Sequence, residues 1–227
     1  TRTAQRAQLV AGMAALMLLM WLIDAATSAW PLWLAAAGWL INLYWVTHYP
    51  AAGQQWQATP RRLAMGLWVL LPCWVGFNVL RESGMAWLLF VLLLVWCADI
   101  GAYFVGRNWG KRKLAPRVSP GKSWEGVYGG LAATAILAVV FAVWLSLGMA
   151  SSLTLILVTA VVTLTSVLGD LLESMLKRHR NIKDSSQLLP GHGGVLDRID
   201  SLTAAIPLFA LFYLEVLMPM LVQGQSL

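Results

Sequence analysis

The sequence predicts an all-α protein, a polytopic helical bundle embedded in a membrane, and its composition and long apolar segments are the main reasons. Hydrophobic residues make up 59% of the 227 residues and charged residues only 11%, whereas about a quarter of the residues in a soluble domain are charged. The mean hydropathy is +0.69. A transmembrane barrel would alternate apolar and polar residues, but the run from Trp87 to Trp96 is apolar throughout. Helices are therefore favoured over strands.

Seven segments are apolar and long enough to form transmembrane helices, which need about 20 residues each to cross a bilayer. They cover approximately residues 8–26, 30–47, 64–80, 85–105, 126–148, 152–172 and 199–222. Because they leave little chain for a soluble domain, we expect residues 1–227 to form one transmembrane domain.

The distribution of the 16 Lys and Arg residues predicts the topology. If the seven segments cross the membrane alternately, one side receives the basic N-terminal tail and the loops 48–63, 106–125 and 173–198. These regions carry every Lys and Arg except Arg81. Cytoplasmic loops carry an excess of Lys and Arg, so this side is predicted to be the cytoplasm. Attraction to anionic lipids explains the cations of the tail and the first loop, but the two longer loops need a further explanation.

Five carboxylates lie where these predicted helices approach the cytoplasmic side. Asp170 and Glu173 end the sixth helix, Asp197 and Asp200 begin the seventh, and Asp99 lies near the end of the fourth. Residues three apart share a helical face, and carboxylates at a membrane edge are costly unless they are paired. Oxygen ligands of this kind suit Mg²⁺, which shares its coordination between carboxylates and substrate phosphates. For any single carboxylate, an ion pair with a neighbouring Arg or Lys is the alternative.

The loop between the two acidic pairs combines cations with glycines. Lys177, Arg178 and Lys183 can neutralise phosphate oxygens. The turn Pro190-Gly-His-Gly-Gly194 lets backbone amides approach an anion just before a helix begins. Glycines before a helix are also ordinary turn chemistry, so the prediction of a phosphate site depends on the whole combination.

The other long loop contains Gly121-Lys122-Ser123, which invites comparison with the Walker A motif. The comparison fails, because Pro116 occupies the position of the first glycine and no hydrophobic strand precedes the loop. Ser119, Lys122 and Ser123 still offer hydroxyl and ammonium groups beside a Pro-Gly turn that opens a helix. We expect them to hold a nucleotide phosphate tail.

Three blocks of residues resemble the signature of the phosphatidate cytidylyltransferases, also called CDP-diacylglycerol synthases. They are Ser174-x-Leu176-Lys177-Arg178, Lys183-Asp184-x-Ser186 and Leu189-Pro190-x-His192-Gly193-Gly194-Val195-x-Asp197-Arg198-Ile199-Asp200. The resemblance extends upstream through residues 167–170, 119–126 and 98–103, although Ile100 stands where relatives often carry a small polar residue. It covers roughly the last 140 residues, and the first 80 match only as hydrophobic helices. The chain thus looks like an N-terminally truncated member, with N-terminal helices over 8–80 and catalytic helices and loops over 85–227.

The resemblance implies that CTP and phosphatidate give CDP-diacylglycerol and pyrophosphate, in phospholipid biosynthesis at the bacterial inner membrane with the site facing the cytoplasm. The lipid phosphate is already an anionic nucleophile, so catalysis can rest on positioning and charge neutralisation. Mg²⁺ is the expected cofactor, with a second, monovalent ion as an option. The expected partners are CTP, phosphatidate, membrane lipids and, as an option, a second copy in a homodimer, but no nucleic acid.

Each candidate residue receives a hypothetical role in this chemistry. The metal ligands are predicted to be Asp170 and Asp197, with Asp200 and Asp99 as outer or second-metal ligands. The catalytic set is predicted to be Lys177, Arg178, Lys183, Asp184, His192 and Arg198. The substrate-binding set is predicted to be Ser119, Lys122, Ser123, Gly193 and Gly194. His192 has three open roles, which are structural, phosphate-contacting and proton-transferring.

Two other functions fit part of the pattern. A CTP-dependent lipid or polyprenol kinase would use a similar site but would transfer the terminal phosphoryl group to a hydroxyl. A transporter would place its polar residues near the middle of the membrane, whereas here they cluster at one face. Cytidylyl transfer is therefore the expected reaction, and the kinase is the alternative.

Overall fold

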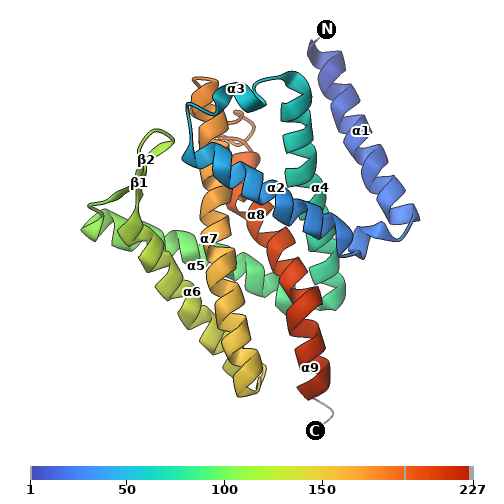
Figure 1. The fold of residues 1–227 in the computed structure, drawn as a ribbon, viewed down its shortest axis with the longest axis vertical. Helices are drawn as coiled ribbons and strands as arrows, with labels where there is room; N and C mark the ends of the chain where they lie inside the picture. The colour runs from blue at the N-terminus through green and yellow to red at the C-terminus, as the bar shows by residue number, and fades with distance from the viewer. Residues whose placement is uncertain (1, 192, 225–227) are drawn as a thin grey trace.

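The computed structural model describes residues 2–191 and 193–224 as a helical bundle with one small β-hairpin (Figure 1). The N-terminal half contains α1 (Arg2–Leu22), the 3₁₀ turn η1 (Ala25–Thr27), α2 (Trp30–Thr47), the short α3 (Gly53–Trp56), α4 (Thr59–Ser83) and α5 (Met85–Trp109). The hairpin strands β1 (Lys113–Ala115) and β2 (Ser119–Ser123) follow, and then come α6 (Trp124–Trp144), α7 (Met149–His179), α8 (Leu196–Phe212), the π-helical turn η2 (Tyr213–Leu217) and α9 (Met218–Gly224).

All seven predicted segments are helical, and five of these helices are long and apolar enough to cross a membrane. These are α4, α5, α6, α7 and the continuous segment Leu196–Gln223. The first two predicted segments fall short of that standard, because only Ala7–Leu22 of α1 is a continuous apolar stretch and α2 includes four Trp residues and Asn42. The all-α membrane fold is confirmed, with five clear spans in the described part of the chain.

The positions of the chain ends agree with the predicted order of membrane crossings. In Figure 1 the N-terminus, α3 and the end of α7 lie at the top of the view, while the C-terminus lies at the bottom. The hairpin projects from the connection between α5 and α6, and α2 runs obliquely across the bundle. The loops that carry the candidate residues of 173–198 therefore lie at the opposite end from the C-terminus.

The sequence analysis predicted a loop over residues 106–125 and did not predict this hairpin. Its strands are antiparallel, with Lys113 opposite Ser123 and Ala115 opposite Ser119. The Ser123 side chain then caps α6, because its Oγ accepts a hydrogen bond from the Gly126 amide at 3.2 Å. This arrangement places Lys122 at a defined position directly before the helix.

Glycines allow the helices that carry the candidate site to approach closely. A Cβ atom on Gly101 of α5 would lie 2.6 Å from the Gly129 carbonyl oxygen of α6. A Cβ atom on Gly169 of α7 would lie 2.5 Å from the Asp200 carbonyl oxygen of α8. Both separations are too short for any side chain, so these contacts require glycine. The second contact brings Asp200 beside the turn that carries Asp170.

Candidate active site

The Lys122 ammonium group joins the hairpin to α7. Its Nζ lies 2.6 Å from the Asp170 Oδ2 atom, and the two side chains are 25% and 29% exposed. Asp170 also accepts a hydrogen bond from the Ser174 hydroxyl at 3.2 Å. A pair that is this accessible can exchange its contact for one with a bound anion or cation.

A cavity of about 530 Å³, which we call the polar cavity, surrounds this ion pair. Its charged lining residues come from three elements, and they are Asp99, Arg107, Lys122 and Asp170. Such a volume is in the range of small-molecule sites. The cavity therefore combines two cations and two carboxylates at the cytoplasmic end predicted for these helices.

Arg107 is a candidate residue that the sequence-based reasoning missed. Its guanidinium donates a hydrogen bond to the Tyr103 hydroxyl at 2.7 Å, and both residues line the polar cavity. Asp99, Tyr103 and Arg107 follow one another at four-residue spacing, which places them on one face of α5. That spacing was a signal that could have identified Arg107.

Asp99, Asp170 and Asp200 come from three helices and lie near enough to interact electrostatically. Their convergence agrees with the sequence-based expectation. Within residues 2–191 and 193–224, however, no three acidic, His or Cys side chains form a complete metal-binding group. Mg²⁺ commonly takes only one or two protein carboxylates and completes its shell with waters and phosphates, so this donor set fits Mg²⁺ in the presence of a phosphate substrate.

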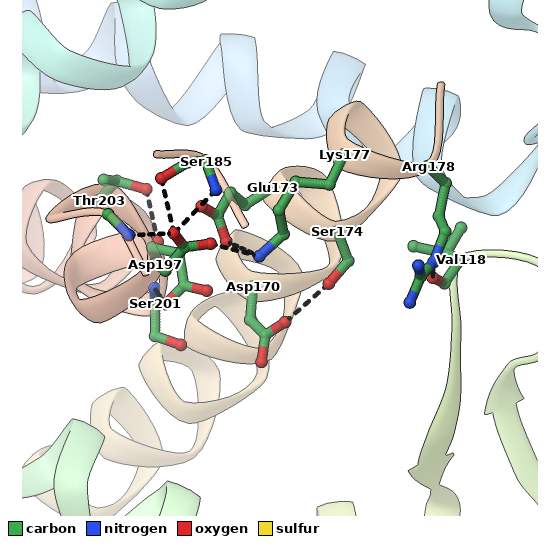
Figure 2. A network of polar contacts seen from close by, with 12 residues as sticks. Val118, Asp170, Glu173, Ser174, Lys177, Arg178, Ser185, Asp197, Ser201 and Thr203 are labelled. Carbon is green, nitrogen blue, oxygen red and sulfur yellow. Dashed lines mark hydrogen bonds and ion pairs between the residues drawn. The ribbon is translucent and has the colours of Figure 1, made fainter. Parts of the chain in front are cut away.

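Lys177 lies about two turns after Asp170 on α7 and takes part in a buried ion-pair network (Figure 2). Its Nζ lies 2.7 Å from Glu173 Oε2 and 2.7 Å from Asp197 Oδ1. The side chains of Glu173 and Asp197 are each only 6% exposed. Lys177 thus compensates two buried carboxylates in the described structure, instead of lying free to meet a phosphate.

Asp197 fastens the loop that precedes α8. Its Oδ2 atom accepts hydrogen bonds from the Ser185 amide at 2.9 Å, the Ser185 hydroxyl at 2.7 Å and the Gly194 amide at 2.7 Å. The other oxygen, Oδ1, accepts a hydrogen bond from Lys177 Nζ and can accept one further contact. The hydrogen bonds show that Asp197 holds this loop in place, and its predicted metal-binding role stays a prediction.

Asp170 and Glu173 were expected to lie on one helical face, but they line different cavities. Asp170 lines the polar cavity with Lys122, whereas Glu173 lines a smaller cavity of about 270 Å³ between α4, α7 and α8. Asp200 lines this smaller cavity as well. The two carboxylates share one side of the helix only in part, because three residues advance a helix by somewhat less than one full turn.

The remaining predicted residues are distributed around this centre. Arg178 points toward the hairpin, where its Nε donates to the Val118 carbonyl oxygen at 3.3 Å (Figure 2). Lys183 and Asp184 are exposed in the loop, and Arg198 lies in the first turn of α8. Two substrate-binding candidates, Ser119 and Ser123, lie in β2 of the hairpin. Two others, Gly193 and Gly194, lie in the loop before α8. His192 lies outside the residues that the structure describes.

Comparison with known proteins identifies the family. Residues 1–216 match the sequence profile of the Cytidylyltransferase family. The chain belongs to the cytidylyltransferase family.

Three bacterial relatives carry the name phosphatidate cytidylyltransferase. The protein of Pseudomonas aeruginosa is 53% identical over 179 residues, which cover 78% of this chain and 66% of the relative. That of Haemophilus influenzae is 48% identical over 195 residues, covering 81% and 68%. That of Bacillus subtilis is 43% identical over 137 residues, covering 59% and 51%. The matched part of this cytidylyltransferase family member thus spans about half to two thirds of these relatives.

Proposed function

We propose that this protein transfers the cytidylyl group of CTP to phosphatidate, giving CDP-diacylglycerol and pyrophosphate. The family membership of residues 1–216 carries the proposal, and the names of the relatives support the identity of the lipid substrate. The polar cavity supports it chemically, because Arg107 and Lys122 give a triphosphate two cations beside the carboxylates of Asp99 and Asp170.

The proposed reaction is a substitution at the α-phosphorus of CTP. An oxygen of the phosphatidate phosphate forms the new P–O bond, and the bond from the α-phosphorus to the oxygen that bridges to the β-phosphorus breaks. Pyrophosphate leaves with the electron pair of that bond. The nucleophile is already an anion, so no strong base is required. Lys122 and Arg107 would stabilise the negative charge of the triphosphate and of the departing pyrophosphate.

Mg²⁺ fits the proposal as a cofactor held by Asp170, with Asp99 and Asp200 as further oxygen donors. When bound, it would neutralise phosphate charge and favour the departure of pyrophosphate. Asp197 remains a predicted ligand, but its hydrogen bonds to Ser185 and Gly194 favour the role of holding the loop. A second, monovalent ion also remains a prediction.

The proposed location is the bacterial inner membrane, with the polar cavity open to the cytoplasm and lipids around the bundle. The concentration of Lys and Arg in the loops of one side supports this orientation. A homodimer remains a prediction, which the mass of the purified protein in detergent would test.

Labelled CTP tests the reaction and separates it from the kinase alternative. The purified protein would be incubated with phosphatidate, Mg²⁺ and CTP that carries ³²P at either the α or the γ position. Cytidylyl transfer moves the α label into lipid and releases the γ label in pyrophosphate. A lipid kinase, given a hydroxyl lipid, would instead move the γ label into lipid and release CDP.

A further inference from the structure

Lys122 is the cation that compensates the carboxylates converging near the polar cavity. Its ammonium group forms an ion pair with Asp170 at 2.6 Å, and it also interacts electrostatically with Asp99 and Asp200, which come from two other helices. Within residues 2–191 and 193–224, Asp170 is the one carboxylate of the three that pairs with it directly. Like charges at one site repel one another unless a cation lies among them. Lys122 thus supplies the compensation that a divalent cation would otherwise supply.

Both oxygens of the Asp170 carboxylate already have a hydrogen-bond donor. Oδ2 contacts the Lys122 Nζ atom, and Oδ1 accepts a hydrogen bond from the Ser174 hydroxyl at 3.2 Å (Figure 2). Because a cavity partly excludes water, an ammonium group and a divalent cation on one carboxylate repel each other more strongly there than in bulk solvent. Binding of a metal ion alone to Asp170 therefore has to displace Lys122 and leave its charge without a partner.

The same cost applies to a nucleotide that binds without metal. A triphosphate that attracts the Lys122 ammonium leaves Asp170 unpaired, and the carboxylates of Asp99 and Asp170 then face a further anion in the cavity that they line. When metal and triphosphate bind together, the ammonium group can pair with a phosphate oxygen and the carboxylate with the metal. Each member of the pair then exchanges one partner for another, and neither charge is left uncompensated.

The hairpin allows the Lys122 side chain to make this exchange while its backbone stays in place. Ser123, the next residue, pairs with Lys113 across the strands, and its Oγ accepts a hydrogen bond from the Gly126 amide of α6. The Lys122 side chain itself is 25% exposed, and a lysine ammonium group is carried on a flexible aliphatic stem. Rotation of this side chain is therefore enough to move the charge from the carboxylate to a ligand.

We propose that the Lys122–Asp170 pair makes the binding of divalent metal and of nucleotide mutually dependent, because each ligand must take one member of the pair from the other. This inference rests on the proposed function, since it concerns metal and CTP at the polar cavity. It has a consequence that can be measured without turnover. Loss of either partner should improve the binding of the ligand that uses the remaining partner, when that ligand is present alone.

Mn²⁺ binding without nucleotide tests the metal half of the proposal. Mn²⁺ suits the same oxygen ligands as Mg²⁺, and the electron paramagnetic resonance signal of free Mn²⁺ reports its binding to the whole protein in detergent. We expect Lys122→Met to lower the Kd for Mn²⁺ roughly tenfold, an ordinary size for coupling between two ligands. Arg107→Met is the matched control, because it removes the same charge from the same cavity, although the Arg107 guanidinium contacts Tyr103. Its effect should be smaller.

A double variant shows whether the gained ion binds at Asp170. Lys122→Met/Asp170→Asn removes the carboxylate that the single variant frees, so we expect it to lose the gain in Mn²⁺ affinity. The proposal would be overturned by an unchanged Kd in Lys122→Met, by an equal gain in Arg107→Met, or by a gain that persists in the double variant.

Nucleotide binding without metal tests the other half. The probe is the α,β-methylene analogue of CTP, which has no oxygen bridge to cleave between the α- and β-phosphorus, and its Kd would be measured by calorimetry in EDTA. We expect Asp170→Asn to bind it roughly tenfold more tightly than the wild type does. Asp99→Asn is the matched control, because it removes the same charge from the lining of the same cavity without breaking an ion pair of the described structure. A gain in Asp99→Asn as large as that in Asp170→Asn would contradict the proposal.

The label-transfer assay on the wild type separates the two possible failures. Loss of a partly exposed ion pair costs little stability, so we expect the variants to unfold near the wild-type temperature. If the wild type transfers the α label of CTP to lipid while neither single variant gains affinity, the coupling is wrong and the proposed function stands. If both affinities rise as expected but the wild type transfers no label, the pair couples metal and nucleotide binding and the proposed reaction is wrong.

Discussion

The Nζ atom of Lys122 lies 2.6 Å from the Oδ2 atom of Asp170, and this ion pair connects the base of the β-hairpin, just before α6, to α7, the longest helix among the described residues. The hairpin has only eight residues in its two strands, so the contact with α7 gives it a fixed attachment near the polar cavity. The pair also holds one cation and one carboxylate where a metal-bound triphosphate would need both. Each side chain can then exchange its partner when substrate binds.

Removal of the divalent metal should abolish turnover, and Asp99 should affect how much metal is needed. We expect EDTA to stop label transfer and Mg²⁺ to restore it. Asp99→Asn should raise the Mg²⁺ concentration for half-maximal rate by about 10–100-fold, the usual effect of losing an outer metal partner. The control is Glu82→Gln, which removes an exposed carboxylate paired with Arg81. Equal Mg²⁺ dependence of the Asp99 and Glu82 variants would contradict the assignment.

Loss of Lys177 should destabilise the fold, because it leaves Glu173 and Asp197 buried without their cation. We expect Lys177→Met to lower the free energy of unfolding by about 3–5 kcal/mol, as for other broken buried ion pairs. Thermal unfolding in detergent measures the direction of this effect. Addition of Glu173→Leu should recover part of the loss, since it removes one of the two uncompensated carboxylates. No recovery in the double variant would argue against the buried network.

The hydrogen bonds of Asp197 predict that it controls the order of the loop before α8. Asp197→Ala removes the acceptor of the Ser185 and Gly194 donors, so we expect trypsin to cleave after Lys183 about tenfold faster or more. Ser185→Ala should give a smaller increase, because the Ser185 amide still donates to Asp197. Cleavage at the wild-type rate in Asp197→Ala would show that the loop is held by other contacts.

The close packing of α5 against α6 should not tolerate a methyl group at Gly129. A Cβ atom there would lie 2.5 Å from the Val105 side chain. We expect Gly129→Ala to destabilise the protein by about 1–3 kcal/mol through overpacking. Gly66→Ala is the matched control, because no atom lies within 4 Å of its added Cβ. Similar unfolding temperatures for the two variants would contradict the observed packing.

Hydropathy and charge were sufficient to predict the helices and the end of the bundle that carries the site. Asp99, Asp170 and Asp200 could be placed together because each lies near the same predicted end of a helix. Lys122 could be selected because a Pro-Gly turn and a predicted helix surround it. These are local patterns, and the membrane restricts the ways in which such segments can be arranged.

The partners of individual side chains could not be predicted in the same way. The hydrogen bonds that Asp197 accepts from Lys177 and from three donors of Ser185 and Gly194 were not predicted, and one of these donors directly follows Gly193, where φ is +81°. The pairing of Lys113 with Ser123 depends on a strand register that a three-residue strand signals only weakly. Such contacts are set by tertiary packing.

Label transfer by a Lys122 variant tests the central claim most directly, which is that the polar cavity carries out cytidylyl transfer. The rate at which the α label of CTP enters phosphatidate would be compared for the wild type, Lys122→Met and Lys111→Met. Lys111 is an exposed cation of the same loop and is the matched control. We expect Lys122→Met to lose about 10²-fold or more in rate, the usual effect of removing a transition-state donor, and Lys111→Met to stay near the wild type. Wild-type transfer by a folded Lys122→Met protein would contradict the account.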